Sequence, residues 1–93
     1  LPKNLKGIVV HPNPFSPNTT GSKEITFAKL TVNAIIDIFT LNGELVKSGI
    51  EGRSGYAIWD GRNDGGSEGV SGLYIYLIRS DIDKTVGKIL IIR

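Results

Sequence analysis

The sequence has 93 residues, 40% of them hydrophobic, and a net charge of +2. This length favours one domain and excludes two independent cores. Basic residues are spread along the chain, whereas a nucleic-acid binder usually collects them in one run or on one face. No apolar run approaches the ~20 residues of a membrane span. There is no cysteine, so the core and the hydrogen bonds must hold the fold without disulfides.

Residues 1–6 are expected to form a linker or arm ahead of a single domain at 7–93. The chain begins without methionine, and we expect it to be a processed or excised piece of a longer protein. Residues 12–18 contain three prolines, which remove three backbone donors and exclude a ladder strand. We expect this segment to be a rigid crossing that places Phe15 in the core.

Seven short strands are predicted, because apolar runs alternate with Gly, Pro, Asn and Asp at spacings typical of a sandwich or barrel. No stripe with the helical period exceeds two turns. The predicted strands are 7–11, 23–29, 34–41, 44–50, 56–60, 72–80 and 85–93. Side chains expected to face the core alternate along these strands; they are Ile25, Phe27, Ile36, Ile38, Tyr74, Tyr76 and Ile78.

The segments between these strands are rich in turn residues. Asn42-Gly43 predicts a hairpin, because both residues tolerate positive φ. Residues 61–69 form a glycine-dense loop, and 81–84 a turn. Residues 72–80 are apolar on both faces, which is typical of a central strand. Seven antiparallel strands in a chain of this length predict an all-β sandwich of the Ig-like or fibronectin-III-like kind.

Four oxygen-bearing side chains crowd the glycine-dense loop and its approach. They are a weak candidate for calcium, which takes six to eight oxygen ligands, although their spacing is not that of an EF-hand. Asp and Asn in such loops also bond their own backbone in Asx-turns, which is the interpretation we favour. The four residues are Asp60, Asn63, Asp64 and Glu68.

Catalysis is not expected, and no cofactor is predicted. His11 is the only histidine, and alone it forms neither a catalytic triad nor a metal site. No serine lies in a nucleophile elbow. Trp59, Tyr74 and Tyr76 would offer a sugar-binding platform if exposed, but the two tyrosines alternate on a central strand, which favours burial. Residues 18–20 match the short N-glycosylation motif and are interpreted as a turn.

Five segments are distinctive in composition and order: 11–16 (HPNPFS), 36–46 (IDIFTLNGELV), 59–62 (WDGR), 70–76 (VSGLYIY) and 88–93 (KILIIR). Together they resemble a family of Ig-like C-terminal domains that shares a profile with the flagellar hook-cap protein. The same pattern occurs in the type A sorting domains of the type IX secretion system. The resemblance covers about residues 8–93, and the basic residue after the apolar last strand favours the sorting branch.

The resemblance implies a non-catalytic domain that marks a larger exported bacterial protein for transport across the outer membrane and attachment at the cell surface. Its partners would be the secretion machinery or neighbouring domains, with translocon recognition at Lys88 and Arg93. The apolar last strand between these two residues must be covered, paired or offered to a partner. The residues implied to keep the fold are Pro12, Asn13, Pro14, Phe15, Asn42, Gly43, Trp59, Asp60, Gly61, Gly72 and Tyr74.

Two alternatives remain open at this point. One is a retained structural spacer or assembly module, as in a hook-cap or filament protein, and the other is an accessory module that binds carbohydrate or calcium. Sorting predicts that loss of the last strand blocks export, and a structural role predicts a domain present in the mature product. Ligand binding predicts thermal stabilisation by calcium or glycan.

Overall fold

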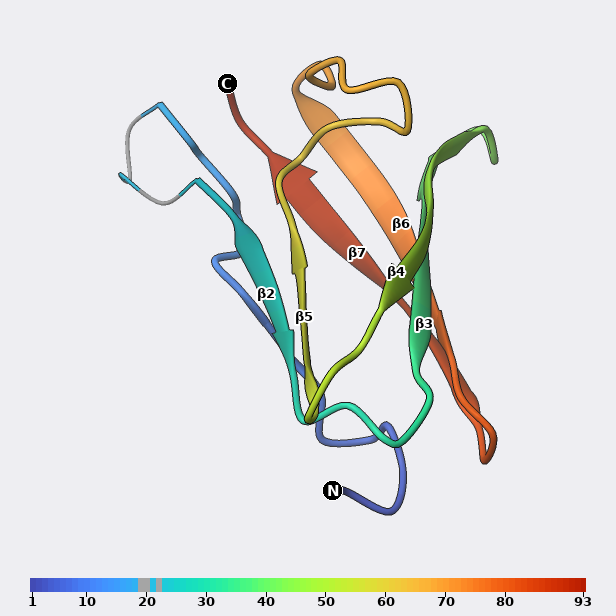
Figure 1. The fold of residues 1–93 in the computed structure, drawn as a ribbon. Helices are drawn as coiled ribbons and strands as arrows, with labels where there is room; N and C mark the ends of the chain where they lie inside the picture. The colour runs from blue at the N-terminus through green and yellow to red at the C-terminus, as the bar shows by residue number, and fades with distance from the viewer. Residues whose placement is uncertain (19–20, 22) are drawn as a thin grey trace.

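The computed structural model describes residues 1–18, 21 and 23–93. Its strands are β1 (Val9–His11), β2 (Ile25–Ala28), β3 (Ile35–Thr40), β4 (Leu45–Glu51), β5 (Tyr56–Trp59), β6 (Gly72–Arg79) and β7 (Lys84–Ile91). One sheet has the order β1-β2-β5 and the other β4-β3-β6-β7, and all strand pairs are antiparallel. The two sheets face each other (Figure 1). The predicted seven-stranded antiparallel β-sandwich is therefore confirmed, and it is consistent with an Ig-like fold.

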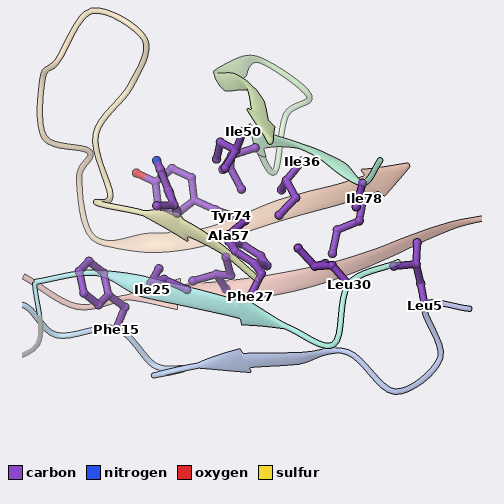
Figure 2. Packing of buried hydrophobic residues seen from close by; sticks show 14 of the residues in the cluster. Leu5, Phe15, Ile25, Phe27, Leu30, Ile36, Ile50, Ala57, Tyr74 and Ile78 are labelled. Carbon is purple, nitrogen blue, oxygen red and sulfur yellow. The ribbon is translucent and has the colours of Figure 1, made fainter. Parts of the chain in front are cut away.

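The core lies between the inner faces of the two sheets (Figure 2). Each predicted strand overlaps an observed one, and the side chains predicted to face the core lie in it or pack against it. The completely enclosed side chains are Trp59, Phe15, Phe27, Leu5, Ile25, Leu30, Ile36, Ile38, Ile78, Ile89 and Ile91. Burying one large apolar side chain contributes ~1.5–3 kcal/mol, so this cluster is the main source of stability.

Strand β6 runs through the middle of the four-stranded sheet, between β3 and β7, as its two apolar faces predicted. On the inner side Tyr74 and Ile78 are buried. Tyr76 packs edge-on against Phe27, with 5.5 Å between the ring centroids. On the other side Leu73 remains 41% exposed. Only the inner apolar face of β6 is therefore covered by the opposite sheet.

The hairpin between β3 and β4 lies where Asn42-Gly43 predicted it. Gly43 takes a φ of 88°, and its N–H donates to the Thr40 carbonyl at 3.0 Å. The Thr40 N–H in turn donates to the Glu44 carbonyl at 2.9 Å. This is a three-residue loop that ends in a left-handed glycine. Both Asn42 and Gly43 tolerate positive φ, but only Gly43 adopts it.

The N-terminal arm, residues 1–6, contains no strand, but it is anchored to the sandwich. The Leu5 side chain is enclosed in the core, and its N–H donates to Asp83 Oδ2 at 3.1 Å. Asp83 belongs to the predicted turn, which is present as the connection from β6 to β7. The motif at 18–20 lies partly outside the described residues. Within those residues no helix is long and apolar enough to cross a membrane.

The free edge of β7 is covered by the proline-rich crossing. The Asn13 side-chain amide donates to the Lys88 carbonyl at 3.0 Å, and its oxygen accepts from the Leu90 N–H at 3.1 Å. The Phe15 N–H donates to the Leu90 carbonyl at 2.7 Å, and its carbonyl accepts from the Ile92 N–H at 2.9 Å. Phe15 is fully buried, as predicted. The second half of the apolar last strand is therefore not open to strand addition at this edge.

The opposite edge of the same sheet, β4, is covered by Asp64 of the glycine-dense loop. The Asp64 N–H donates to the Val46 carbonyl at 2.9 Å. Its carboxylate accepts from the Ser48 N–H at 3.2 Å and from the Ser48 hydroxyl at 3.0 Å. Lys47 lies 3.7 Å from the same carboxylate. The Asp64 carboxylate at the β4 edge and the Asn13 side-chain amide at the β7 edge thus bond backbone groups that a further strand would otherwise bond.

Candidate functional site

Four of the five segments that carry the family resemblance come together at one end of the sandwich. There the connection from β5 to β6 bends over the core, and the chain beyond β7 lies alongside it (Figure 1). Close contacts of Phe15, Gly61 and Arg93 join parts of the chain that are distant in sequence. We call Phe15, Arg93 and residues 60–69 the loop end.

Arg93 bonds the end of the last strand to the glycine-dense loop. Its Nε–H donates to the Gly69 carbonyl, and its Nη2 donates to the Gly61 carbonyl at 3.0 Å. Nη1 donates to Glu68 Oε2 at 3.1 Å, and the Arg93 N–H donates to Ser71 Oγ at 2.8 Å. The side chain is only 16% exposed. Because a guanidinium offers its donors in a rigid fork, Arg93 fixes the relative positions of the two glycine carbonyls.

Gly61 allows the loop to close on its neighbours. Its φ is 80°, which favours glycine. A Cβ at this position would lie 3.0 Å from Phe15 Cε2 and 3.1 Å from Arg93 Nη2. Both the backbone conformation and the available space therefore require a glycine, as the resemblance implied for this residue.

Trp59 and Tyr74 are buried beneath the loop end, and each bonds a carbonyl of the loop. The Trp59 Nε1–H donates to the Arg62 carbonyl at 2.9 Å, and the Tyr74 hydroxyl donates to the Val70 carbonyl at 2.6 Å. The two rings meet edge-on with centroids 6.1 Å apart. Each buried ring thus has a partner for its polar group, and the loop backbone is held at two more points.

The surface of the loop end carries charges of both signs. Asp60 Oδ1 accepts from the Arg62 N–H at 3.0 Å, and Arg62 Nη2 lies 3.6 Å from Glu68 Oε1. These side chains are about half exposed, so each ion pair contributes at most ~1 kcal/mol. A polar hollow of about 440 Å³ beside them is lined by Pro17, Asn18, Lys23, Glu24, Asp60, Arg62, Glu68 and Arg93.

The structure does not bring the four calcium candidates together. Asp64 is turned toward β4, and Asn63 Oδ1 accepts from the Ser67 N–H at 2.9 Å. Asp60 bonds its own backbone two residues on, in the manner of an Asx-turn, while Glu68 faces two arginines. Over residues 1–18, 21 and 23–93, no three acidic or histidine side chains form a group that could hold a metal ion.

The aromatic residues considered for sugar binding do not form a platform. Trp59 and Tyr74 are buried, and partial burial of Tyr76 raises the pKa of its hydroxyl above the ordinary value of 10.0. The most exposed ring is Tyr56, at 59%, which lies on the three-stranded sheet. His11 is exposed at the end of β1.

Lys88 and Arg93 point to opposite sides of the four-stranded sheet. Lys88 lies opposite Ile75 and is exposed, whereas Ile89 and Ile91 beside it point into the core. None of the ion pairs in the described part of the chain involves Lys88. The side of this sheet that points away from the core carries the charged residues Asp37, Arg79 and Lys84 near the β6–β7 turn. We call the mainly apolar remainder of this side, on β3, β6 and β7, the outer face; its members are Phe39, Leu73, Ile75, Leu77, Val86, Lys88, Leu90 and Ile92.

Sequence reasoning missed three contacts of this region. They are the bonds from the Asn13 amide to β7, the bonds from Arg93 to the loop carbonyls, and the bonds from Asp64 to β4. All three join a side chain to backbone groups at least 16 residues away. Period-two alternation could have indicated that Arg93 lies on the same side as Ile91, but not what it meets there.

Comparison with known structures shows a similar fold within two much larger proteins of Porphyromonas gingivalis. PorZ, an essential bacterial surface component of the type IX secretion system, matches with a TM-score of 0.77 and 24% identity, over 94% of this chain and 12% of PorZ. Dimeric latent PorU matches with a TM-score of 0.62 and 21% identity, over 91% of this chain and 9% of PorU. The chain therefore spans about a tenth of either protein, and the likeness establishes the fold. No family model and no curated protein matches the sequence.

Proposed function

We propose that this chain is a non-catalytic sorting domain of the type IX secretion kind. It would mark a larger bacterial protein for transport across the outer membrane and attachment at the cell surface. One observation carries the proposal. Four of the five segments that resemble the family meet at the loop end, where Arg93 bonds the Gly61 carbonyl, Phe15 lies against Gly61, and the Trp59 and Tyr74 rings meet edge-on. A signature whose parts share one site is more specific than the same motifs scattered over a fold.

The fold comparisons support the setting of this role. PorZ is a surface component of the secretion system, and the matched part is a small share of PorZ and of PorU. A domain carried by a much larger protein is what sorting requires. The partner would be the outer-membrane secretion machinery, which reads the shape of the folded domain.

Recognition by shape agrees with the chemistry of the loop end. Arg93 holds the loop carbonyls of Gly61 and Gly69, so its role in recognition would be to present a fixed loop. Lys88 would act directly, because this residue is exposed on the outer face. The proposed mechanism is recognition, in which no proton is transferred and no bond is broken. It therefore assigns no role to His11, the lone histidine, which lies at the end of β1.

The first experiment compares the full-length protein with a variant that lacks residues 7–93, in the bacterium that produces it. We expect the variant to accumulate inside the cell while the unmodified protein reaches the surface. Peptide mapping of the surface and medium fractions then shows whether 1–93 is removed after export. Normal export of the variant would contradict the proposal.

The peptide map also tests the main alternative, a retained structural module. The covered edges of the four-stranded sheet favour this candidate as well, because a spacer must not pair with other sheets. Full-stoichiometry peptides from 1–93 together with export that does not need the domain would establish a structural role. Full-stoichiometry peptides with export that does need it would define a sorting domain that is not cleaved.

A further inference from the structure

The outer face departs from the usual pattern of an antiparallel sheet that faces water. Such a face normally carries polar side chains, but along β6 and β7 the opposing pairs are Leu73–Leu90, Ile75–Lys88 and Leu77–Val86, followed by the charged pair Arg79–Lys84 at the turn. Leu73, Val86 and the following Ile92 are 41%, 63% and 48% exposed. Contiguous exposed apolar surface of this kind marks an interaction site.

Lys88 lies on the edge strand of this apolar surface, midway along β7. Directly opposite it is Ile75, and its neighbours along the same side of β7 are Val86 and Leu90. Leu73 and Leu77 lie at the diagonal positions of β6, within reach of a long side chain. Among the described residues Lys88 takes part in no ion pair, and its five neighbours on the same side of β6 and β7 are apolar, which constrains what can cover the surface.

Charge complementarity identifies the kind of occupant. Covering this surface would bury the Lys88 ammonium group, which is costly unless an opposite charge is provided. A second copy of the chain packed face to face would offer the carboxylate of Asp37 on β3, but that carboxylate already pairs with Arg79 at 3.0 Å. The occupant must therefore bring its own carboxylate within an apolar surface.

The placement of the arm argues against a domain that precedes this one. Leu5 is bonded to Asp83 at the β6–β7 turn, and the outer face begins near this turn with Leu77 and Val86 and continues to Leu73, Leu90 and Ile92 at the other end of the strands. A preceding domain would join the sandwich at the turn end. To cover this surface, such a domain would have to extend along the full length of both strands, from Leu77 and Val86 to Leu73 and Leu90.

We infer that the outer face docks a separate protein whose apolar surface carries a carboxylate that pairs with Lys88. This rests on the proposed function and sharpens it, because the partner would belong to the secretion machinery. Recognition would then occur on the outer face, at β6 and β7, while the loop end would stabilise the fold. The apolar contacts supply affinity, and the single charge pair supplies selectivity.

The test places a photo-crosslinking benzoylphenylalanine at Val86 in the full-length protein, in the bacterium that produces it. A matched probe at Ile58 reports on the three-stranded sheet, where Ile58 is 53% exposed. Both probes are combined with Lys88→Glu and with Lys6→Glu as a matched charge reversal in the arm. Mass spectrometry identifies the adduct, and thermal unfolding of each purified variant confirms that it is folded.

We expect an adduct from position 86 to a separate protein, reduced at least about tenfold by Lys88→Glu, because an unpaired or like charge at an interface costs that much or more. Lys6→Glu should leave the adduct unchanged. Exchange of the partner's contacting acid for lysine should restore the adduct with Lys88→Glu. An adduct to a second copy, to lipid or to the same chain would overturn the inference. So would an adduct that is absent, insensitive to Lys88→Glu, or equally strong from position 58.

Failure of this inference can be separated from failure of the proposed function. If removal of 7–93 leaves export unchanged, the sorting role is wrong. If export needs the domain but the position-86 adduct does not depend on Lys88, only the docking surface is wrong.

Discussion

The two basic residues of the last segment, Lys88 and Arg93, show how one sequence signature divides between two physical roles. Arg93 is 16% exposed and donates to three acceptors of the loop end. Lys88 takes part in no ion pair of the described residues and stands among apolar side chains on the outer face. Five positions apart along an extended chain, they face opposite ways. Two charges of the same sign in one short segment can therefore differ in role, and the atoms that surround each side chain determine which role it has.

Arg93→Ala should have the largest effect on stability. It removes the guanidinium donors to the Gly61 and Gly69 carbonyls and leaves the Gly61 carbonyl only the 3.3 Å bond from the Gly69 N–H, which should cost about 2–3 kcal/mol in the free energy of unfolding. Urea unfolding of the purified protein measures this loss. Arg93→Lys should recover only part of it, because an ammonium group lacks the rigid fork.

Arg53→Ala is the matched control for that measurement. Arg53 is 85% exposed and lies 3.7 Å from one carboxylate, so its loss should change stability by less than about 0.5 kcal/mol. Equal losses in the free energy of unfolding for Arg93→Ala and Arg53→Ala would contradict the structural role of Arg93, because they would mean that its bonds do not hold the loop end.

Asn13→Ala should have the next largest effect, about 1 kcal/mol, since two neutral hydrogen bonds to the β7 edge are lost. Hydrogen exchange locates the loss. The Leu90 N–H, which donates to Asn13, should exchange faster, while the Ile92 N–H, which donates to Phe15, should stay protected. Uniform deprotection of both amides would show that the whole crossing detaches and that Asn13 has no separate role.

The stability of the protein at alkaline pH tests the burial of Tyr76, which lies on β6 beside the strand that carries Lys88. Burial raises the pKa of Tyr76 in the folded state, so the unfolded chain loses this proton at a lower pH. The stabilising difference is fully present below the unfolded pKa of about 10, and stability falls as the pH rises from there through the folded pKa. Unfolding midpoints between pH 9 and 11.5 should therefore decline more for the unmodified protein than for Tyr76→Phe.

The fold was predictable because its signals are local. The alternation of Ile25 and Phe27, the Asn42-Gly43 pair and the apolar run of β6 each depend on a few neighbouring residues. The sites were less predictable, because their contacts join positions 32 and 77 residues apart. Loop oxygens such as Asp64 and Glu68 satisfied a compositional pattern for calcium, yet each already has a partner in the fold.

Lys88→Ala should have the smallest effect on stability, within about 0.5 kcal/mol. It is the most direct test of the difference in role between Lys88 and Arg93. The Lys88 carbonyl keeps its bond from Asn13 whatever the side chain is, and no ion pair is lost. A loss well above 1 kcal/mol in urea unfolding would mean that the methylene stem of Lys88 packs on Ile75 and that the residue has a structural role like that of Arg93. Unchanged stability together with impaired export would separate recognition from folding, because the same protein would then be intact and yet not accepted by its partner.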